Sequence, residues 1–178
     1  MNTHLKILLY IGLVVGIFYF VQNKYSIFEI SFNDSKKEVE VEQGEEQTEL
    51  NSVEILNSEE RSIIVEIEIA DNPGSRSSGL SGRSTLGDYQ GMLFIFDRED
   101  SYSFWMQGML IPLDIVFIDS KGTVVDIKKN ELPCTKDYCP SIMASQSFKY
   151  ALEVNSGFCR INRVDIGNEV IFNISSEN

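Results

Sequence analysis

Residues 113–127 read LDIVFIDSKGTVVDI and carry the strongest local structural signal in the sequence. Two apolar runs, residues 113–118 and 123–127, flank the polar segment 119–122, which ends in a glycine. Runs rich in β-branched and aromatic residues, joined by a short turn that contains glycine, are typical of a β-hairpin. The pattern therefore predicts two antiparallel strands joined at residues 119–122.

Further strands are predicted on both sides of this hairpin. Residues 63–69 alternate between apolar and polar side chains after their first step, as a half-buried strand does. Residues 91–96 form a nearly continuous apolar run, which indicates a central strand. Shorter strands are expected at residues 103–106, 150–154 and 170–174.

Helix is expected to be minor. Residues 72–74 predict a break, residues 75–83 fit either one short helix or a loop, and residues 130–146 are expected to form a long loop. The spacing of the strands favours antiparallel pairing and shows no βαβ rhythm. We therefore expect an α+β fold with a mostly antiparallel, compact, barrel-like sheet and one or two short helices, preceded by an N-terminal transmembrane helix.

The N-terminus has the pattern of an export signal. Residues 7–21 read ILLYIGLVVGIFYFV, with no charge and no proline, and they follow Lys6. The residues after this run fit a cleavage site poorly, so we predict an uncleaved signal anchor over residues 1–25, with a cleaved signal as the alternative. Lys6 and the α-amino group favour a single pass of the cytoplasmic membrane with the N-terminus inside. The C-terminal domain is then periplasmic or extracellular.

The net charge of the chain limits the classes of partner that it is expected to bind. Acidic residues outnumber basic ones 27 to 15, and the net charge is -12. Such a charge argues against nucleic-acid binding, which needs a basic face, and we expect no nucleic-acid partner. Acidic residues dominate residues 26–52, which we interpret as a flexible linker between the membrane and an extracytoplasmic domain at residues 53–178.

Three cysteines are present. Cys134 and Cys139 are separated by four residues, and each abuts a proline. In an exported domain this spacing favours a disulfide, while a metal-binding pair or a redox-active pair are the alternatives. The metal alternative needs two more ligands, and no nearby residues have matching spacing. Cys159 is interpreted as a small buried hydrophobic residue.

Most familiar catalytic motifs are absent. His4 is the only histidine, so the predicted domain has no Ser-His, Cys-His or His-zinc site. The sequence also contains no Walker A motif, no G-x-G-x-x-G and no EF-hand loop. We therefore expect neither a cofactor nor a metal.

Two carboxylates stand out because they lie within apolar runs. Asp114 follows Leu113 in the hairpin, and Glu153 lies in the predicted strand 150–154. A carboxylate in such a place is either paired, with an arginine as one candidate partner of Asp114, or functional. Strand alternation leaves a solvent-exposed position open for Asp114 as well.

Arg83 and Trp105 complete the candidate ligand-binding set with Asp114 and Glu153. Arg76 and Arg83 lie seven residues apart, which would place them on one face of a helix, and they either hold an anion together or are solvated or ion-paired. Trp105 precedes Met106 and lies close to another methionine, a grouping that fits either a core or a Cu(I) site. A copper site normally also needs a histidine or a cysteine, so the core interpretation is favoured.

Several short motifs occur in a characteristic order along the chain. They are GL at 79–80, Arg83, GMLFIF at 91–96, FWM at 104–106, IPLDIVFID at 111–119 and YALEV at 150–154. Their order and spacing over residues 60–174 resemble the DUF192 family. The resemblance implies a compact, mostly β domain, agrees with an export signal and with a cysteine pair at 134 and 139, and assigns no reaction. The chain departs from the family pattern at Ser81 and at residues 107–109, which puts a carried-over binding role there in doubt.

These observations predict a membrane-anchored extracytoplasmic domain whose role is binding or assistance in the cell envelope. Its partners would be the membrane, through the N-terminal helix, and an unknown small ligand or envelope protein. The alternative is a hydrolase or lyase that uses carboxylates and arginines on a glycan or other envelope substrate. It requires two carboxylates in one cleft, about 5–10 Å apart. A third possibility is a structural partner module with an exposed apolar patch and no pocket.

Overall fold

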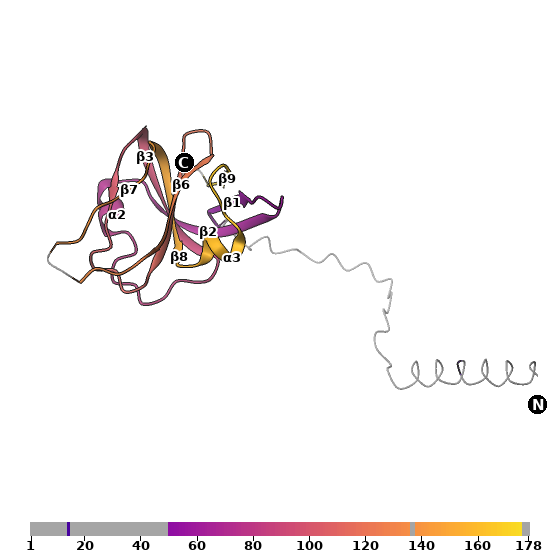
Figure 1. The fold of residues 1–178 in the computed structure, drawn as a ribbon, viewed down its shortest axis with the longest axis horizontal. Coiled ribbons are helices and arrows are strands. Elements are labelled where there is room, and N and C mark those ends of the chain that lie inside the picture. The colour runs from indigo at the N-terminus through magenta and orange to yellow at the C-terminus, as the bar shows by residue number, and fades with distance from the viewer. Residues whose placement is uncertain (1–13, 15–49, 136–137, 176–178) are drawn as a thin grey trace, which may run out of the picture. The chain divides into compact units, whose positions relative to one another are not determined.

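The computed structural model describes Val14, residues 50–135 and residues 138–175. Seven strands form one sheet in the order β6-β5-β8-β3-β2-β1-β9, and β4 and β7 form a separate pair (Figure 1). The bounds of the elements are β1 Ser52–Leu56, β2 Ser62–Ala70, α2 Pro73–Ser78, β3 Gln90–Asp100, β4 Ser103–Phe104, β5 Leu113–Ile118, β6 Val124–Glu131, β7 Ile142–Met143, β8 Phe148–Asn155, α3 Phe158–Asn162 and β9 Glu169–Asn173.

The large sheet curls into a half-barrel. Its two edge strands, β6 and β9, approach each other through a bridge between Thr123 and Glu169. The amide of Val170 also donates to the carbonyl of Gly122, at 2.7 Å. Gly122 has a φ of 85°, and a Cβ at this position would lie 2.6 Å from the carbonyl oxygen of Val170. The glycine that ends the predicted turn therefore also permits this close approach.

The predicted strands are present, and the β5–β6 hairpin is confirmed. The pairing is mostly antiparallel, as predicted, and the exception is β2 with β3, which pair in parallel with α2 between them in the chain, a single βαβ unit that the pattern did not indicate. Asn72 begins α2 by accepting the amides of Gly74 and Ser75, and Pro73 occupies its first turn. The helix spans six residues, which is too short to produce a helical period in the sequence.

Three further elements were not predicted. β1 begins at Ser52, the last residue assigned to the linker, and α3 follows β8 directly. Residues 130–146 are not one loop, because β6 extends to Glu131 and β7 pairs with β4 within this segment. Elements of two to five residues carry too little periodicity for a pattern to reveal them.

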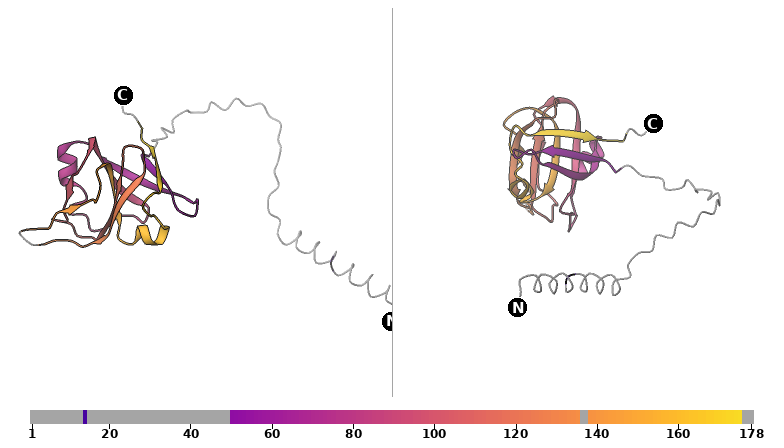
Figure 2. Two further views of the ribbon diagram at one scale, coloured as in Figure 1. Left: turned by 45° about the horizontal axis from the view of Figure 1, so that its top comes forward. Right: turned by 90° about the vertical axis from the view of Figure 1, so that its right-hand side faces the viewer.

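Side chains on the two faces of the sheet form separate core clusters. The first, called the α3-side cluster, comprises Val53, Ile55, Val65, Ile67, Leu93, Val116, Ile118, Val124, Leu152, Val154, Phe158, Cys159, Val164 and Val170. The second, called the α2-side cluster, comprises Ala70, Leu80, Met92, Phe94, Phe104, Met106, Met109, Leu113, Ile115, Phe117, Phe148 and Ala151. Both views in Figure 2 place α2 and α3 at opposite sides of the domain.

The predicted membrane segment is not tested by these elements. Within the residues that the structure describes, no helix has the length and apolar character needed to cross a membrane. The predicted anchor at residues 1–25, apart from Val14, and residues 26–49 of the predicted linker lie outside the described residues.

Candidate functional site

A cavity of about 330 Å³ opens on the α2 side of the sheet. Its walls come from α2 and the turn after it, from β3, and from the segment that contains β4. The lining residues are Pro73, Arg76, Ser77, Ser78, Gly79, Leu80, Ser81, Phe94, Phe96, Tyr102, Ser103, Phe104, Trp105, Gln107, Met109 and Glu153. Two of the four predicted site residues, Trp105 and Glu153, therefore belong to one cavity.

Glu153 is the carboxylate of this lining. It lies on β8 between Met92 of β3 and Ile115 of β5, so both cross-strand neighbours are apolar. The residue is 5% exposed, and its carboxyl group, which borders the cavity, has no hydrogen-bond or ion-pair partner among the described residues. Burial raises the pKa of Glu153 to about 8. The group is therefore mostly protonated at neutral pH in the free protein.

Aromatic rings supply much of the cavity wall. The ring of Phe94 meets that of Phe104 edge to face, with centroids 5.1 Å apart. Phe96 and Tyr102 stack with centroids 3.8 Å apart. Trp105 is 47% exposed, in contrast to its buried neighbour Phe104. The cavity thus joins buried rings to a tryptophan that solvent reaches.

Arg76 is the basic residue of the lining. One of its Nη atoms donates to the carbonyls of Asp71, at 2.6 Å, and Ile95, at 2.9 Å. Its guanidinium also lies 5.2 Å from the centre of the Phe96 ring. These contacts hold Arg76 against the end of β2 and the middle of β3 and leave it without an ion pair to Glu153 among the described residues.

The two sides of the cavity are joined by a backbone contact. The amide of Gly82 donates to the carbonyl of Gly108 at 2.9 Å. Gly108 has a φ of 74°, and a Cβ there would lie 2.4 Å from the hydroxyl of Ser81. Ser81 and residues 107–109, where the chain departs from the family pattern, therefore meet at this contact. Any side chain at position 108 would both strain the backbone and crowd Ser81.

Asp114 has a structural role on the other face of the sheet. Its side chain is 1% exposed and accepts three backbone amides, those of Asn130 at 2.8 Å, Gly157 at 3.1 Å and Cys159 at 3.0 Å. The predicted pairing is thus confirmed, but the partners are amides and not an arginine, and the exposed alternative is wrong. Asp114 joins the end of β6 to the start of α3.

Arg83 forms an ion pair away from the cavity lining. Its guanidinium donates to both carboxylate oxygens of Glu68, and both side chains are more than a third exposed. The hydrogen bond from Arg83 is the main reason that the pKa of Glu68 is lowered. Of the two interpretations of Arg83, the ion-paired surface arginine describes what the structure contains.

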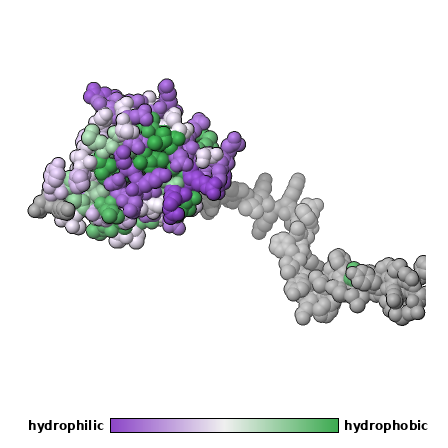
Figure 3. Space-filling model, in the orientation of Figure 1, coloured by the Kyte–Doolittle hydropathy of each residue, from purple (hydrophilic) through white to green (hydrophobic). Residues whose placement is uncertain are grey.

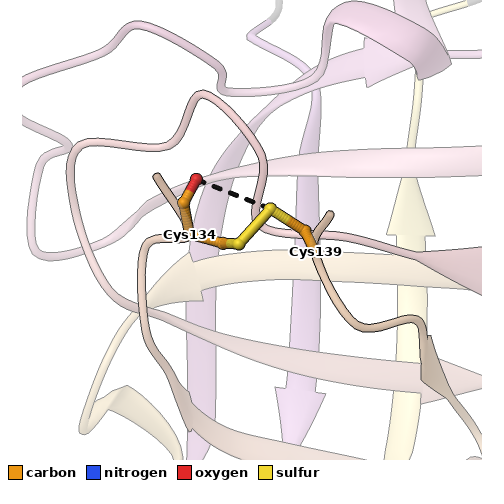
Figure 4. Close-up of a disulfide and its surroundings, with 2 residues drawn as sticks. All are labelled: Cys134 and Cys139. Atoms are coloured by element: carbon orange, nitrogen blue, oxygen red, sulfur yellow. Dashed lines mark hydrogen bonds between the residues drawn. A yellow bond between two sulfur atoms is a disulfide. The ribbon is translucent and has the colours of Figure 1, made fainter. Parts of the chain in front are cut away.

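The cysteines divide as the sequence indicates. Cys134 and Cys139 form a disulfide with their Cα atoms 5.9 Å apart (Figure 4). The amide of Cys134 donates to the carbonyl of Met106 at 3.0 Å, which joins the disulfide loop to the segment beside the cavity. Cys159 is buried as predicted, and burial, with nearby Asp114 as the second cause, raises the pKa of its thiol.

The part of the chain that the structure describes offers no cluster of metal ligands. The described residues contain no group of three or more His, Cys, Asp or Glu side chains that could hold a metal ion. Met106 and Met109 are buried in the α2-side cluster, so the core interpretation is confirmed for the two methionines, but it is wrong for Trp105, which is 47% exposed. The thioether of Met109 also borders the cavity.

Several residues that line the cavity do not belong to the ligand-binding set predicted from the sequence. Arg76, Leu80, Tyr102 and Phe104 line the cavity with Trp105 and Glu153. Their signal was available in part, because Leu80 and Phe104 belong to two of the motifs that resemble the family. What joins them is the pairing of strands far apart in the chain, which those motifs do not encode.

Comparison with known proteins gives related chains of unassigned biochemical role. The DUF192 family model, described as an uncharacterized ACR, matches residues 54–172. A UPF0127 protein of Pyrococcus abyssi is 31% identical over 106 residues, which are 58% of this chain and 83% of that protein.

Two solved structures are also similar. One, from Sinorhizobium meliloti, is described as "a putative transcription regulator"; it is 29% identical, with a TM-score of 0.65, and the match covers 68% of this chain and 92% of that one. A protein of unknown function from Novosphingobium aromaticivorans is 28% identical, with a TM-score of 0.63, over 67% and 83% of the two chains. With the family model matching most of its length, this chain belongs to the DUF192 family.

Proposed function

We propose that this protein is a binding module of the cell envelope that takes a small molecule into the cavity above Glu153. The observation that carries the proposal is a buried carboxyl group without a protein partner at the wall of a cavity. Among the described residues no fully buried side-chain nitrogen or oxygen lacks a hydrogen-bond partner, so the unpartnered carboxyl oxygens of Glu153 reach the space of the cavity, where a ligand can contact them. A mostly apolar cavity with a few polar groups of perturbed pKa is the usual form of a ligand site.

The proposed location is outside the cytoplasmic membrane, with residues 1–25 as the anchor. Two sequence features support it, the apolar run at 7–21 and the acidic segment after it. The disulfide between Cys134 and Cys139 adds to them, because such bonds persist in oxidising compartments. Maleimide labelling of whole cells, with and without a reductant, tests this. Labelling of both cysteines without a reductant would contradict the proposed location.

The alternative enzyme needs a second carboxylate in the cleft. β5 and β8 pair with Asp114 opposite Val154 and Ile115 opposite Glu153. Paired residues point to the same face and successive residues to opposite faces, so Asp114 and Glu153 point away from each other. Glu153 is the one acidic side chain among the lining residues. This arrangement favours binding over a reaction that uses two carboxylates.

Other partners have less support. The net charge of -12 argues against nucleic acid, and what is said of the Sinorhizobium protein is therefore not extended to this one. A module that only docks on a protein needs a broad apolar surface. On the face drawn in Figure 3, hydrophobic residues reach the surface in separate areas bordered by hydrophilic ones. The cavity is the better basis for a function.

A native mass spectrum of the chain, released gently from its own membrane, tests the proposal. We expect a reproducible added mass that is lost in Glu153→Gln and reduced in Trp105→Ala. Arg83→Ala is the matched control, because Arg83 does not line the cavity and should leave the added mass unchanged. A bare chain mass from every preparation would contradict the proposal.

A further inference from the structure

The chemistry of the cavity indicates which class of ligand it takes, an inference that rests on the proposed function. The wall combines one buried carboxyl group with the rings of Phe94, Phe104 and Trp105. A carboxylate attracts a cation and accepts its hydrogen bonds, and aromatic faces attract cations through their quadrupoles. We propose that the ligand is a small organic ammonium compound whose charged nitrogen binds Glu153 and whose apolar body packs on the aromatic wall.

No charged group around Glu153 would balance the negative charge that its carboxyl group carries when it is ionised. Its cross-strand neighbours, Met92 on β3 and Ile115 on β5, carry no charge. From the segment that contains β4, the cavity receives tyrosine, tryptophan, glutamine and methionine side chains and no basic one. From α2 it receives Arg76, which contacts two backbone carbonyls and the Phe96 ring. A bound cation would therefore be the partner that Glu153 lacks.

The size of the cavity limits the ligand. At about 30 Å³ for each water-sized group, 330 Å³ holds roughly ten non-hydrogen atoms. This suits an amine with a short alkyl chain and one ring, and it excludes a polymer bound along its length within the cavity.

Binding of a cation must displace a proton from Glu153. The free carboxyl group is largely protonated below pH 8, since burial raises its pKa to about 8. When the ammonium ion binds, the carboxyl O–H bond breaks, the proton passes to solvent and a carboxylate–ammonium pair forms. A primary alkylamine stays protonated in this range, because the pKa of such an ammonium group is about 10.4. The affinity should therefore rise about tenfold per pH unit below pH 8 and level off above it.

Calorimetric titration of the purified full chain tests the inference with three probes of similar shape. They are 2-phenylethylamine as the cation, 2-phenylethanol as the neutral compound and 3-phenylpropionate as the anion, each at pH 6, 7 and 8. We expect the amine to bind at least tenfold more tightly than the alcohol at pH 8 and to lose most of that preference at pH 6. The anion should bind most weakly.

Two variants distinguish the contribution of the Glu153 carboxylate to probe binding from that of the cavity as a whole. Glu153→Gln should abolish both the preference for the amine and its pH dependence, while Arg83→Ala should retain both. The pH profile of the unmodified protein gives the same information should Glu153→Gln fail to fold. Equal or tighter binding of 2-phenylethanol without pH dependence would overturn the ammonium ligand and leave the binding function standing. If none of the probes binds and the native mass spectrum also shows a bare chain, both proposals fail.

Discussion

Asp114 and Glu153 lie on neighbouring strands, and both are buried, but their surroundings differ. Asp114 accepts three backbone amides on the α3 side of the sheet. Glu153 points to the α2 side, where it meets a cavity and no partner among the described residues. Both occur in apolar runs of similar composition. Burial alone therefore does not assign a role to a carboxylate, whereas its hydrogen bonds do.

The energetics of the two groups follow from their partners. A carboxylate that accepts several amides satisfies those donors and holds the backbone segments that carry them. A buried carboxyl group without partners is destabilised when charged, and the protein keeps it at a cost in stability. Such a cost is common at functional sites, where a ligand supplies what the fold does not.

The largest effect expected from this comparison is on the α3 side. Asp114→Ala leaves three amides without their acceptor, and each buried donor left unsatisfied costs roughly 1–3 kcal/mol. We expect the free energy of unfolding in urea to fall by about 3–5 kcal/mol. Asp88→Ala, at an exposed position, is the control and should change it little. A loss below about 1 kcal/mol for Asp114→Ala would remove the structural role from this carboxylate.

The second effect concerns pH and Glu153. Its pKa in the folded protein, about 8, lies above the ordinary value of 4.5, so the folded state holds a proton that the unfolded state has lost between these values. Its contribution to stability is therefore fully present below pH 4.5 and is lost as the pH rises toward 8. The slope is about 1.4 kcal/mol per pH unit for one proton.

Urea unfolding of the wild type and Glu153→Gln from pH 5 to pH 8 measures this slope. The difference in unfolding free energy between the two proteins should change along the series in favour of the variant as the pH rises. Glu169→Gln, on the edge strand β9 and exposed, is the control. Parallel curves for wild type and Glu153→Gln would show that Glu153 is ionised in both states, which would end the contrast with Asp114.

The third effect concerns the disulfide, whose removal should loosen the α2 side of the sheet and leave the α3 side unchanged. The disulfide closes a short loop with a sequence separation of 5 residues, so the chain-entropy argument gives about 2 kcal/mol for its loss. Its loop is held on the cavity side through the bond from Cys134 to Met106. After Cys134→Ser with Cys139→Ser, amide exchange should accelerate near Met106 and stay slow around Asp114. Equal acceleration on both faces would contradict separate faces.

The smallest effect is expected at Arg83. Exposed ion pairs contribute about 0–1 kcal/mol, and the pair with Glu68 is more than a third exposed on both sides. A double-mutant cycle with Arg83→Ala and Glu68→Gln should give a coupling energy within that range. A coupling well above about 1 kcal/mol, or a change in probe binding, would return Arg83 to the candidate site.

Much of the fold was predictable from local patterns. The hairpin at residues 113–127 has the turn composition and flanking runs that specify it, and the strands at 63–69 and 91–96 follow from apolar periodicity. The parallel pairing of β2 with β3 was missed, because α2 is a six-residue helix begun by Asn72. The disulfide was one of several open alternatives, and the proximity of the two cysteines in the fold decided among them.

The candidate site was predictable only in its components. Local sequence singles out Asp114 and Glu153 as unusual, since a carboxylate within an apolar run costs free energy unless something compensates. Which of them has that compensation depends on register, which sets Asp114 toward α3 and Glu153 toward the cavity. Register is a relation between distant segments, and a single residue step in it exchanges the two faces. Local sequence therefore specifies the main strands and the two unusual carboxylates, whereas strand register makes one of them a structural acceptor and places the other at the cavity.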